Sequence, residues 1–152
     1  MTTNSSAKRV NIVQIKLVRE KSILYSGRQI RSAKDAFNLF RDFLGDVDRE
    51  HFIVLCLDTK NQPTLIQTVH IGSLNSSIVH PREVLKSALL SNAASIIVAH
   101  NHPSDNSSPS PEDIQVTKRL ENACDILGMN LLDHLIICTD NYSSIKEQGY
   151  IN

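Results

Sequence analysis

Short apolar runs alternate with amphipathic stretches along most of this chain. Thr64–Ile71 has the composition of a strand, and the turn residues of Asp58–Pro63 before it predict a hairpin with the preceding apolar run. In Asn11–Leu17, apolar residues alternate with polar ones, which predicts a half-buried strand near the N-terminus. Three further runs are almost continuously apolar, as expected of strands buried on both faces: His51–Leu57, Ser95–Ala99 and Leu131–Cys138.

Three other stretches carry apolar residues at helical spacing. The first follows Ser32 and ends near Gly45, the second opens at Pro81, and the third runs from Ser110 to Gly128. Their buried stripes are expected to be Ala36, Leu39, Phe40, Phe43 and Leu44; Val84, Leu85, Ala88 and Leu89; and Ile114, Thr117, Leu120, Ala123 and Leu127. Because helices alternate with strands and one hairpin is expected, the sequence predicts an α/β sandwich whose sheet is mixed and not purely parallel.

Composition narrows the class of protein. The chain has 152 residues, 41% hydrophobic and 21% charged, which suits a folded domain and argues against a disordered one. No apolar run approaches the roughly 18 residues of a membrane span, and the N-terminus lacks the apolar core of a signal peptide. The three cysteines (Cys56, Cys124 and Cys138) form no C-x-x-C pair, so we expect a reducing, cytoplasmic location and no membrane association.

Charge is unevenly distributed along the chain. Residues 1–46 hold nine Lys and Arg against four acids, a net of +5, and the remainder carries −5. A basic segment of this kind could contact nucleic acid, because phosphate contacts depend on Lys and Arg. It could equally be a solvated surface whose charge balances the acidic half. We expect residues 1–30 to be a basic segment with one strand, packed on or leading into a domain at 31–152.

The stretch from His100 to Asp113 carries the candidate chemistry. If the strand at Ser95–Ala99 continues, His100 and His102 project from one face, where they could share a metal ion, most commonly Zn²⁺. Asp113, at the start of the next helix, could supply a third ligand. Two His and one Asp would leave the fourth tetrahedral position to water, as in catalytic rather than structural zinc sites.

Helix capping offers a simpler explanation for part of this pattern. Ser110 as N-cap, Pro111 at the first helical position and Asp113 at the third form an ordinary helix start. Capping does not account for His100 and His102 at the end of an apolar strand. The two interpretations are compatible, since a hydroxyl that accepts a bond from the backbone still has a hydrogen to donate.

The spacing H-x-H-x(7)-S-x(2)-D, met by His100, His102, Ser110 and Asp113, resembles the JAMM motif of JAB/MPN-domain metalloproteases. The surrounding residues are similar to the RadC branch of that family, in its short stand-alone form without a helix-hairpin-helix region. This likeness covers about residues 30–150 and rests on four motifs: HPREV (80–84), HNHPS (100–104), PSPEDI (109–114) and LLDHLII (131–137).

The resemblance implies an α/β fold of three layers, a mixed sheet flanked by helices in a layout related to cytidine deaminases. The same likeness implies one zinc ion held by His100, His102 and Asp113. It also implies that Ser110 stabilises an oxyanion and that Glu50 is the general base, although Glu50 could be only a charged residue before a strand. The expected activity is hydrolysis of peptide or isopeptide bonds in a peptide or protein substrate.

An alternative is a nucleic-acid-associated accessory protein of the RadC type, acting in DNA repair or mobile elements, whose metal is structural or vestigial. The sequence leaves open the substrate, the oligomeric state and the roles of three residues: His80, Asp133 and His134.

Overall fold

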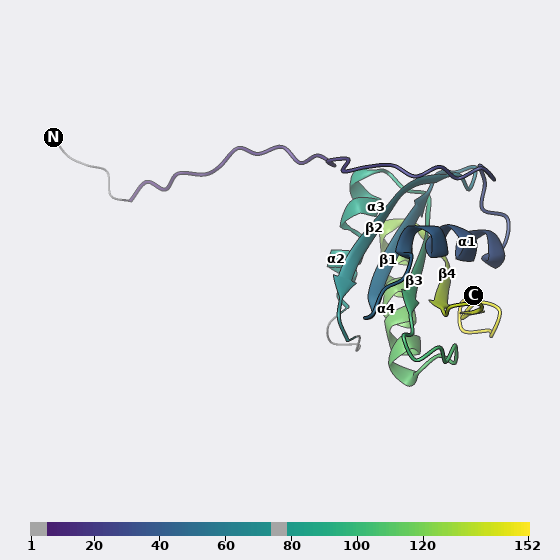
Figure 1. Cartoon of the computed structure of the whole chain (residues 1–152). Helices are drawn as coiled ribbons and strands as arrows, with labels where there is room; N and C mark the ends of the chain where they lie inside the picture. Colours follow the sequence, from purple (N-terminus) through teal and green to yellow (C-terminus); the bar gives the residue numbers. More distant parts are fainter. Residues whose placement is uncertain (1–5, 74–78) are drawn as a thin grey trace.

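A five-stranded mixed sheet forms the centre of the fold (Figure 1). The computed structural model describes residues 6–73 and 79–152. The strands are β1 (His51–Leu57), β2 (Pro63–Ile71), β3 (Ser95–Asn101), β4 (Asn130–Ile137) and β5 (Tyr142–Ser144). Their order is β2-β1-β3-β4-β5, and β3 and β4 are the parallel pair in an otherwise antiparallel sheet. The predicted hairpin and the mixed sheet are therefore confirmed.

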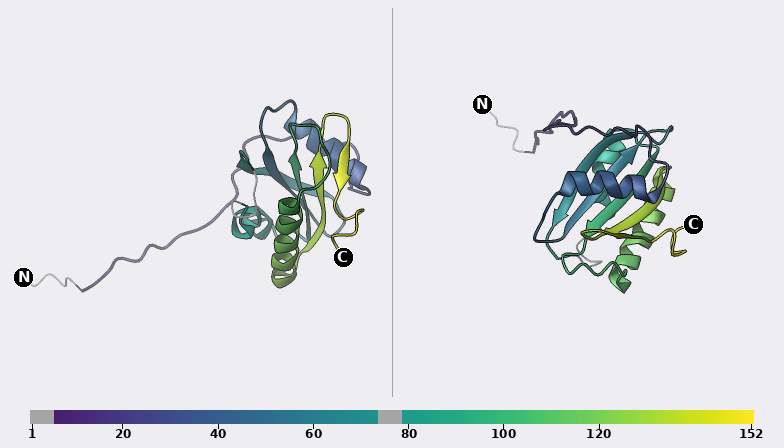
Figure 2. Two further views of the ribbon diagram at one scale, coloured as in Figure 1. Left: turned by 90° about the horizontal axis from the view of Figure 1, so that it is seen from below. Right: turned by 45° about the vertical axis from the view of Figure 1, so that its right-hand side comes forward.

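Helices cover both faces of this sheet (Figures 1 and 2). The helix α1 (Ala33–Leu44) lies across one face. On the other face lie α2 (Pro81–Val84), α3 (Lys86–Leu90) and the long α4 (Pro111–Leu127). This arrangement confirms the predicted three-layer α/β architecture.

The continuous apolar runs are strands buried on both faces, as predicted. In β1, Ile53, Leu55 and Leu57 pack under α1, while the residues between them face the α4 side. Burying each such side chain contributes about 1.5–3 kcal/mol to stability. The central strand β3 is buried along its whole length between β1 and β4. The chain segment that carries the two histidines is therefore one of the most firmly held in the molecule.

Two capping residues set where the main helices begin. The Ser32 side chain accepts a hydrogen bond from the Asp35 backbone N–H at the start of α1. At the start of α4, the Ser110 side chain accepts from the Asp113 backbone N–H, and the Asp113 side chain accepts from the Ser110 backbone N–H. This capping box places the first turn of α4 beside the end of β3.

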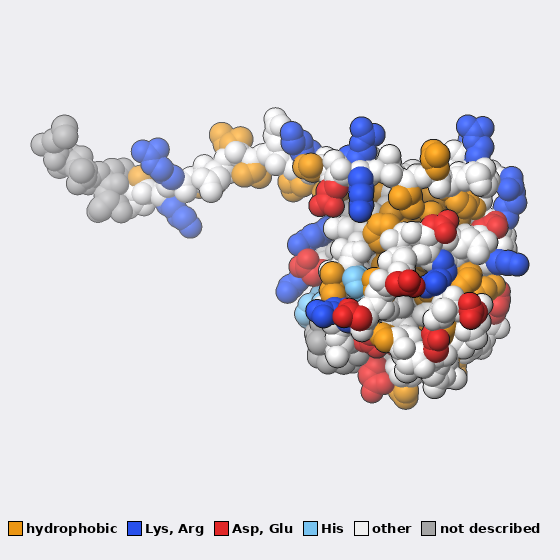
Figure 3. Space-filling view, viewed as in Figure 1, with side chains coloured by type: hydrophobic (Ala, Val, Ile, Leu, Met, Phe, Trp, Pro, Cys, Tyr) orange, Lys and Arg blue, Asp and Glu red, His pale blue; other side chains and the backbone are white. Residues whose placement is uncertain are grey.

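The strand predicted at Asn11–Leu17 was wrong. Residues 8–25 form neither helix nor strand, and their side chains are largely exposed on an extended segment that leaves the domain (Figures 1 and 3). Alternating apolar residues favour a strand only where a neighbouring strand pairs with the backbone and a core covers one face. Residues 1–5 of the predicted basic segment lie outside the described residues, and the boundary at residue 30 stays a prediction.

Two of the predicted helical stripes end earlier than expected. The helix that opens at Pro81 is interrupted at Leu85 and forms two short pieces, so the periodicity does not reach Leu89, which is half exposed. In the last turn of α4, Leu127 is also exposed, beyond the part of the helix that contacts the sheet. Within the two described ranges, no helix is both long enough and apolar enough to cross a bilayer.

Candidate metal centre

The end of β3 brings His100 and His102 to the same side of the sheet. His100 is the penultimate residue of β3, buried between Phe52 of β1 and Ile136 of β4. One residue beyond the strand, the His102 backbone N–H donates to the Ile137 carbonyl (3.0 Å), which keeps the chain extended. The Nε2 atoms of the two imidazoles lie 2.9 Å apart. Both side chains therefore project in the direction that the two-residue spacing predicts.

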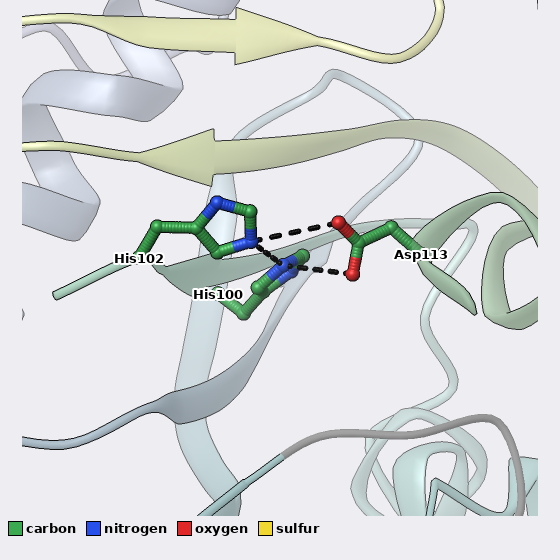
Figure 4. A group of neighbouring side chains, drawn as sticks. All are labelled: His100, His102 and Asp113. Carbon is green, nitrogen blue, oxygen red and sulfur yellow. Dashed lines mark hydrogen bonds and ion pairs between the residues drawn. The ribbon is translucent and has the colours of Figure 1, made fainter. Parts of the chain in front are cut away.

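Asp113 completes a cluster with the two histidines (Figure 4). Its Oδ1 lies 3.1 Å from Nε2 of His100, and its Oδ2 lies 3.5 Å from Nε2 of His102. Oδ2 also accepts the capping hydrogen bond from the Ser110 backbone N–H (2.8 Å). The capping and ligand interpretations thus hold together: the cap orients the carboxylate that faces the imidazoles. We call His100, His102 and Asp113 the metal centre.

The donor atoms of the metal centre fit a small divalent cation. Ligands about 2.1 Å from one zinc ion at tetrahedral angles lie about 3.4 Å from one another. The observed separations run from 2.9 to 3.5 Å. Nδ1 of His102 lies 2.6 Å from the Asn106 carbonyl oxygen, which can only accept, so Nδ1 carries the hydrogen and Nε2 of the neutral ring offers a lone pair. Two imidazole nitrogens and a carboxylate are a donor set typical of zinc.

Without a cation, protons and hydrogen bonds of the two histidines offset the negative charge of Asp113. The hydrogen bond to Asp113 raises the pKa of His102 above its usual value, and burial opposes the rise. Burial raises the pKa of Asp113, but hydrogen bonds from His100 and His102 outweigh it and leave that pKa well below the usual range. Asp113 is therefore an anion at neutral pH, as a metal ligand must be.

Asn101 connects the metal centre to the segment that carries Glu50. Its side chain points away from the two imidazoles, as expected, and bonds only to backbone: Oδ1 accepts from the His51 N–H (2.7 Å) and Nδ2 donates to the Arg49 carbonyl (2.9 Å). Glu50, between these two residues, is half-buried, and its negative charge is one of the causes that raise the pKa of His102. Asn101 thus holds the backbone on both sides of Glu50 at the end of β3, and the catalytic role of Glu50 stays a prediction.

Ser110 and His80 both occupy capping positions. Ser110 Oγ accepts from the Asp113 N–H (3.1 Å), next to the carboxylate of the metal centre, and its role toward an oxyanion stays a prediction. His80 stands at the N-cap position of α2 without a side-chain capping bond, and it is not one of the three residues of the cluster.

The structure answers which of Asp133 and His134 faces the site. His134 is fully buried and its Nε2 lies 2.8 Å from Nδ1 of His100. Asp133 points to the other side, where it accepts hydrogen bonds from the Ser144 hydroxyl and the Lys146 N–H and so ties the C-terminal segment to β4. Burial lowers the pKa of His134 well below its usual value, so this ring is neutral.

Thr117 is a contributor that the sequence did not reveal as such. Its Oγ1 lies 2.7 Å from Nδ1 of His134 and donates to the Asp113 carbonyl (2.8 Å). The helical stripe correctly placed Thr117 in the core, but as a packing residue. Its position four residues after Asp113, one turn along the same helix face, was the signal that could have found it.

Two hollows flank the metal centre. The smaller borders His100 and Asp113 and is lined by polar side chains such as Glu112 and His134 and by apolar ones such as Phe52 and Val116. The larger borders His102 and carries polar groups that include Arg41. Of the two imidazoles, that of His102 is partly exposed and that of His100 is buried.

Comparison with known proteins identifies the family. Residues 30–150 match the model of the RadC-like JAB domain. A UPF0758 protein of Desulforamulus reducens is 45% identical over 148 residues, covering 90% of this chain and 65% of that relative. The UPF0758 protein YsxA of Bacillus subtilis is 52% identical over 122 residues, covering 80% of this chain and 53% of its own length. The chain thus spans between half and two thirds of these curated relatives, and it belongs to the RadC-like JAB domain family.

Proposed function

We propose that this chain is a zinc-dependent hydrolase of peptide or isopeptide bonds. The observation that carries the proposal is the convergence of His100, His102 and Asp113 on one point that lies beside an open polar hollow. A closed structural site would use four protein ligands, whereas this cluster, searched over the described residues, contains three. The family supports the same function, since its JAMM-type motif is met residue by residue.

The three residues would hold the ion through Nε2 of His100, Nε2 of His102 and the Asp113 carboxylate. A zinc ion supplies Lewis acidity, polarising a carbonyl group and making water acidic enough to lose a proton near neutral pH. The protein's own groups then position and move protons. The groups that we assign to these steps are Glu50 and Ser110.

Glu50 is the proposed general base. Its carboxylate would take a proton from the attacking water and deliver it to the nitrogen of the departing amine. The position is suitable, because Asn101 fixes the backbone on both sides of Glu50 and the carboxylate acts electrostatically on His102.

Ser110 is the proposed oxyanion donor. Its Oγ accepts one hydrogen bond from the Asp113 N–H, which leaves its own hydrogen for the oxygen of the substrate carbonyl. A donor aimed at that oxygen stabilises the charge that develops there in the transition state.

The test is a screen of zinc-loaded protein against peptide and isopeptide substrates, followed by Glu50→Gln. We expect the variant to bind zinc as the wild type does and to lose about 100-fold to 10,000-fold in turnover, the usual contribution of a general base. Asp48→Asn, which removes an exposed carboxylate two residues earlier, is the matched control and should keep full activity. Unchanged hydrolysis by Glu50→Gln would refute the base, and no hydrolysis of any substrate by the zinc-loaded wild type would contradict the function.

The second candidate function, nucleic-acid association, is favoured by one observation. The exposed N-terminal segment carries five cations on an extended backbone: Lys8, Arg9, Lys16, Arg19 and Lys21. If they contact phosphates, the logarithm of the binding constant for duplex DNA should fall with the logarithm of salt concentration, with a slope of about −0.9 per contact. Replacing Lys16, Arg19 and Lys21 by Gln should make this slope shallower. A salt-independent or absent interaction would exclude this candidate.

A further inference from the structure

A chain of hydrogen bonds runs behind the metal centre, from the backbone of one ligand to the ring of another. Thr117 Oγ1 donates to the Asp113 carbonyl (2.8 Å) and lies 2.7 Å from Nδ1 of His134. Nε2 of His134 in turn lies 2.8 Å from Nδ1 of His100. Thr117, His134 and His100 are all buried, so water does not compete for these bonds. We call this set of contacts the Thr117–His134 chain.

The position of each hydrogen in the Thr117–His134 chain follows from the Asp113 carbonyl at one end, because that group can only accept. A backbone carbonyl only accepts, so the single hydrogen of the Thr117 hydroxyl is directed to the Asp113 carbonyl. Toward His134, Thr117 Oγ1 can then only accept, which requires the hydrogen of His134 to be on Nδ1. The assignment depends on the contacts alone, because ring hydrogens are inferred from partners.

In the contact between His134 and His100, the hydrogen belongs to Nδ1 of His100. Neither ring nitrogen of His134 contacts a carboxylate: the partners are the Thr117 hydroxyl and the His100 ring, so an imidazolium would be a buried charge without a direct counter-ion. In the neutral ring Nε2 accepts, and Nδ1 of His100 must donate to it. Nδ1 of His100 therefore carries a hydrogen, and Nε2, which faces Asp113 and His102, is the nitrogen whose lone pair a metal ion would take in place of a proton.

We propose that His134 and Thr117 are positioning residues that hold His100 in the tautomer able to bind the metal ion. The inference rests on the proposed metal centre and deepens it. Histidine ligands are usually oriented by a carboxylate, a carbonyl or water at the second nitrogen. Here His102 follows that rule through the Asn106 carbonyl, whereas His100 uses a neutral imidazole.

The fold explains why these groups meet. His134 is on β4, which lies beside β3 in the sheet, and it pairs in register with Val98, two residues before His100. Thr117 lies one turn after Asp113 and bonds back to its carbonyl, a common habit of Thr inside helices. The Thr117–His134 chain thus joins β3, β4 and α4. Through it, the backbone carbonyl of Asp113 also determines the orientation of the His100 ring.

Two substitutions break the Thr117–His134 chain of hydrogen bonds, and two preserve it. His134→Phe keeps a ring of similar size but removes both nitrogens, and Thr117→Val keeps the shape of threonine but removes the hydroxyl. His134→Gln retains an acceptor for His100 and a donor for Thr117, and Thr117→Ser retains the hydroxyl. Ser87→Ala, which removes a buried hydroxyl of α3 outside this chain, is the control for loss of a core polar atom.

Two measurements on the whole 152-residue protein test the proposal. In the metal-free protein, ¹⁵N shifts report whether Nδ1 or Nε2 of His100 carries the hydrogen. Competition with a chelator then gives the zinc affinity. We expect Nδ1 of His100 to carry a hydrogen in the wild type, and His134→Phe to lose that hydrogen in part and to bind zinc about 10-fold to 100-fold more weakly. Thr117→Val should show a smaller loss of the Nδ1 hydrogen of His100 and of zinc affinity. Both quantities should stay near the wild-type values in the three other variants: Thr117→Ser, His134→Gln and Ser87→Ala.

The outcomes separate this inference from the proposed function. Wild-type Nδ1 protonation and zinc affinity in both His134→Phe and Thr117→Val would overturn it, as would a wild-type His100 without a hydrogen on Nδ1. If His134→Phe does not fold, Thr117→Val against Thr117→Ser decides alone. A wild type that binds zinc but hydrolyses nothing contradicts only the proposed function, because the tautomer and the affinity do not depend on turnover.

Discussion

The N-terminal segment and β3 contain similar runs of branched apolar residues but have opposite surroundings. In residues 10–18, the apolar side chains of Val10, Ile12, Val13 and Ile15 are largely exposed on an extended backbone (Figure 3). In β3, all seven residues from Ser95 to Asn101 are buried. The difference lies in the neighbours, since β3 has β1 on one side and β4 on the other.

This contrast explains why the metal centre sits where it does. A strand paired on both sides leaves little freedom to its backbone, so the direction of His100 is determined by the sheet and not by the histidine itself. An extended segment without such pairing can present residues to a partner but cannot hold three side chains in place. The following experiments test the contrast, from the largest expected effect to the smallest.

Limited trypsin digestion should show the largest difference between the N-terminal segment and the folded domain, in the rate of cleavage. We expect cleavage after Lys16 and Arg19 to be at least about 1,000-fold faster than after Arg119, because cleavage within α4 requires opening of the core. A time course followed by mass spectrometry measures both rates. Comparable rates at the two places would mean that the N-terminal segment is protected in solution.

Truncation of apolar side chains should separate the two regions in stability. Leu120→Ala, in the fully buried part of α4, should lower the free energy of unfolding by about 2–5 kcal/mol. Ile12→Ala, at a fully exposed position, should change it by less than about 0.5 kcal/mol. Urea denaturation of the two variants gives both values. A cost for Ile12→Ala similar to that for Leu120→Ala would show that the segment packs on the protein.

Zinc should stabilise the domain through its effect on the metal centre alone. At a free zinc concentration 100 times Kd, the expected gain is about 2.7 kcal/mol, and a chelator should remove it. Because Asp113 raises the pKa of His102, a proton competes with the ion for Nε2, and zinc binding should therefore strengthen as pH rises from about 6 to about 8. Thermal unfolding with and without zinc across this range measures the gain. A gain that falls with pH would contradict the assignment of His102.

Two helix caps provide the comparison with the smallest expected effect on stability. Ser32→Ala and Ser110→Ala should each cost about 1 kcal/mol of stability, because each removes the same kind of capping bond. Of the two, Ser110→Ala should also lower turnover, by about 100-fold to 1,000-fold, as expected for loss of an oxyanion donor. Equal turnover in both variants would reduce Ser110 to a cap.

Much of the fold could be predicted from the sequence because its signals are local. The strand at His51–Leu57 was predicted with its observed bounds, and the starts of α1 and α4 followed from Ser32 and Ser110. The meeting of His100, His102 and Asp113 was also predictable, since they lie within 14 positions and a strand followed by a capped helix brings them together.

The remaining features depend on contacts between distant parts of the chain. Asp133 and His134 lie in a strand buried on both faces, so periodicity could not tell which of them faces the metal centre. The role of Thr117 requires His134 on another strand to be known first. The strand expected at Asn11–Leu17 failed for the converse reason, because no contact exists among the described residues to pair it.

Zinc stoichiometry is the most direct test of the metal centre. Metal analysis of the purified chain after incubation with zinc and gel filtration should give one ion per chain for the wild type. His100→Ala and Asp113→Ala should each retain almost none, while His80→Ala, which removes a histidine outside the centre, should retain one. A wild type without zinc, or full zinc content in His100→Ala and Asp113→Ala, would contradict the account.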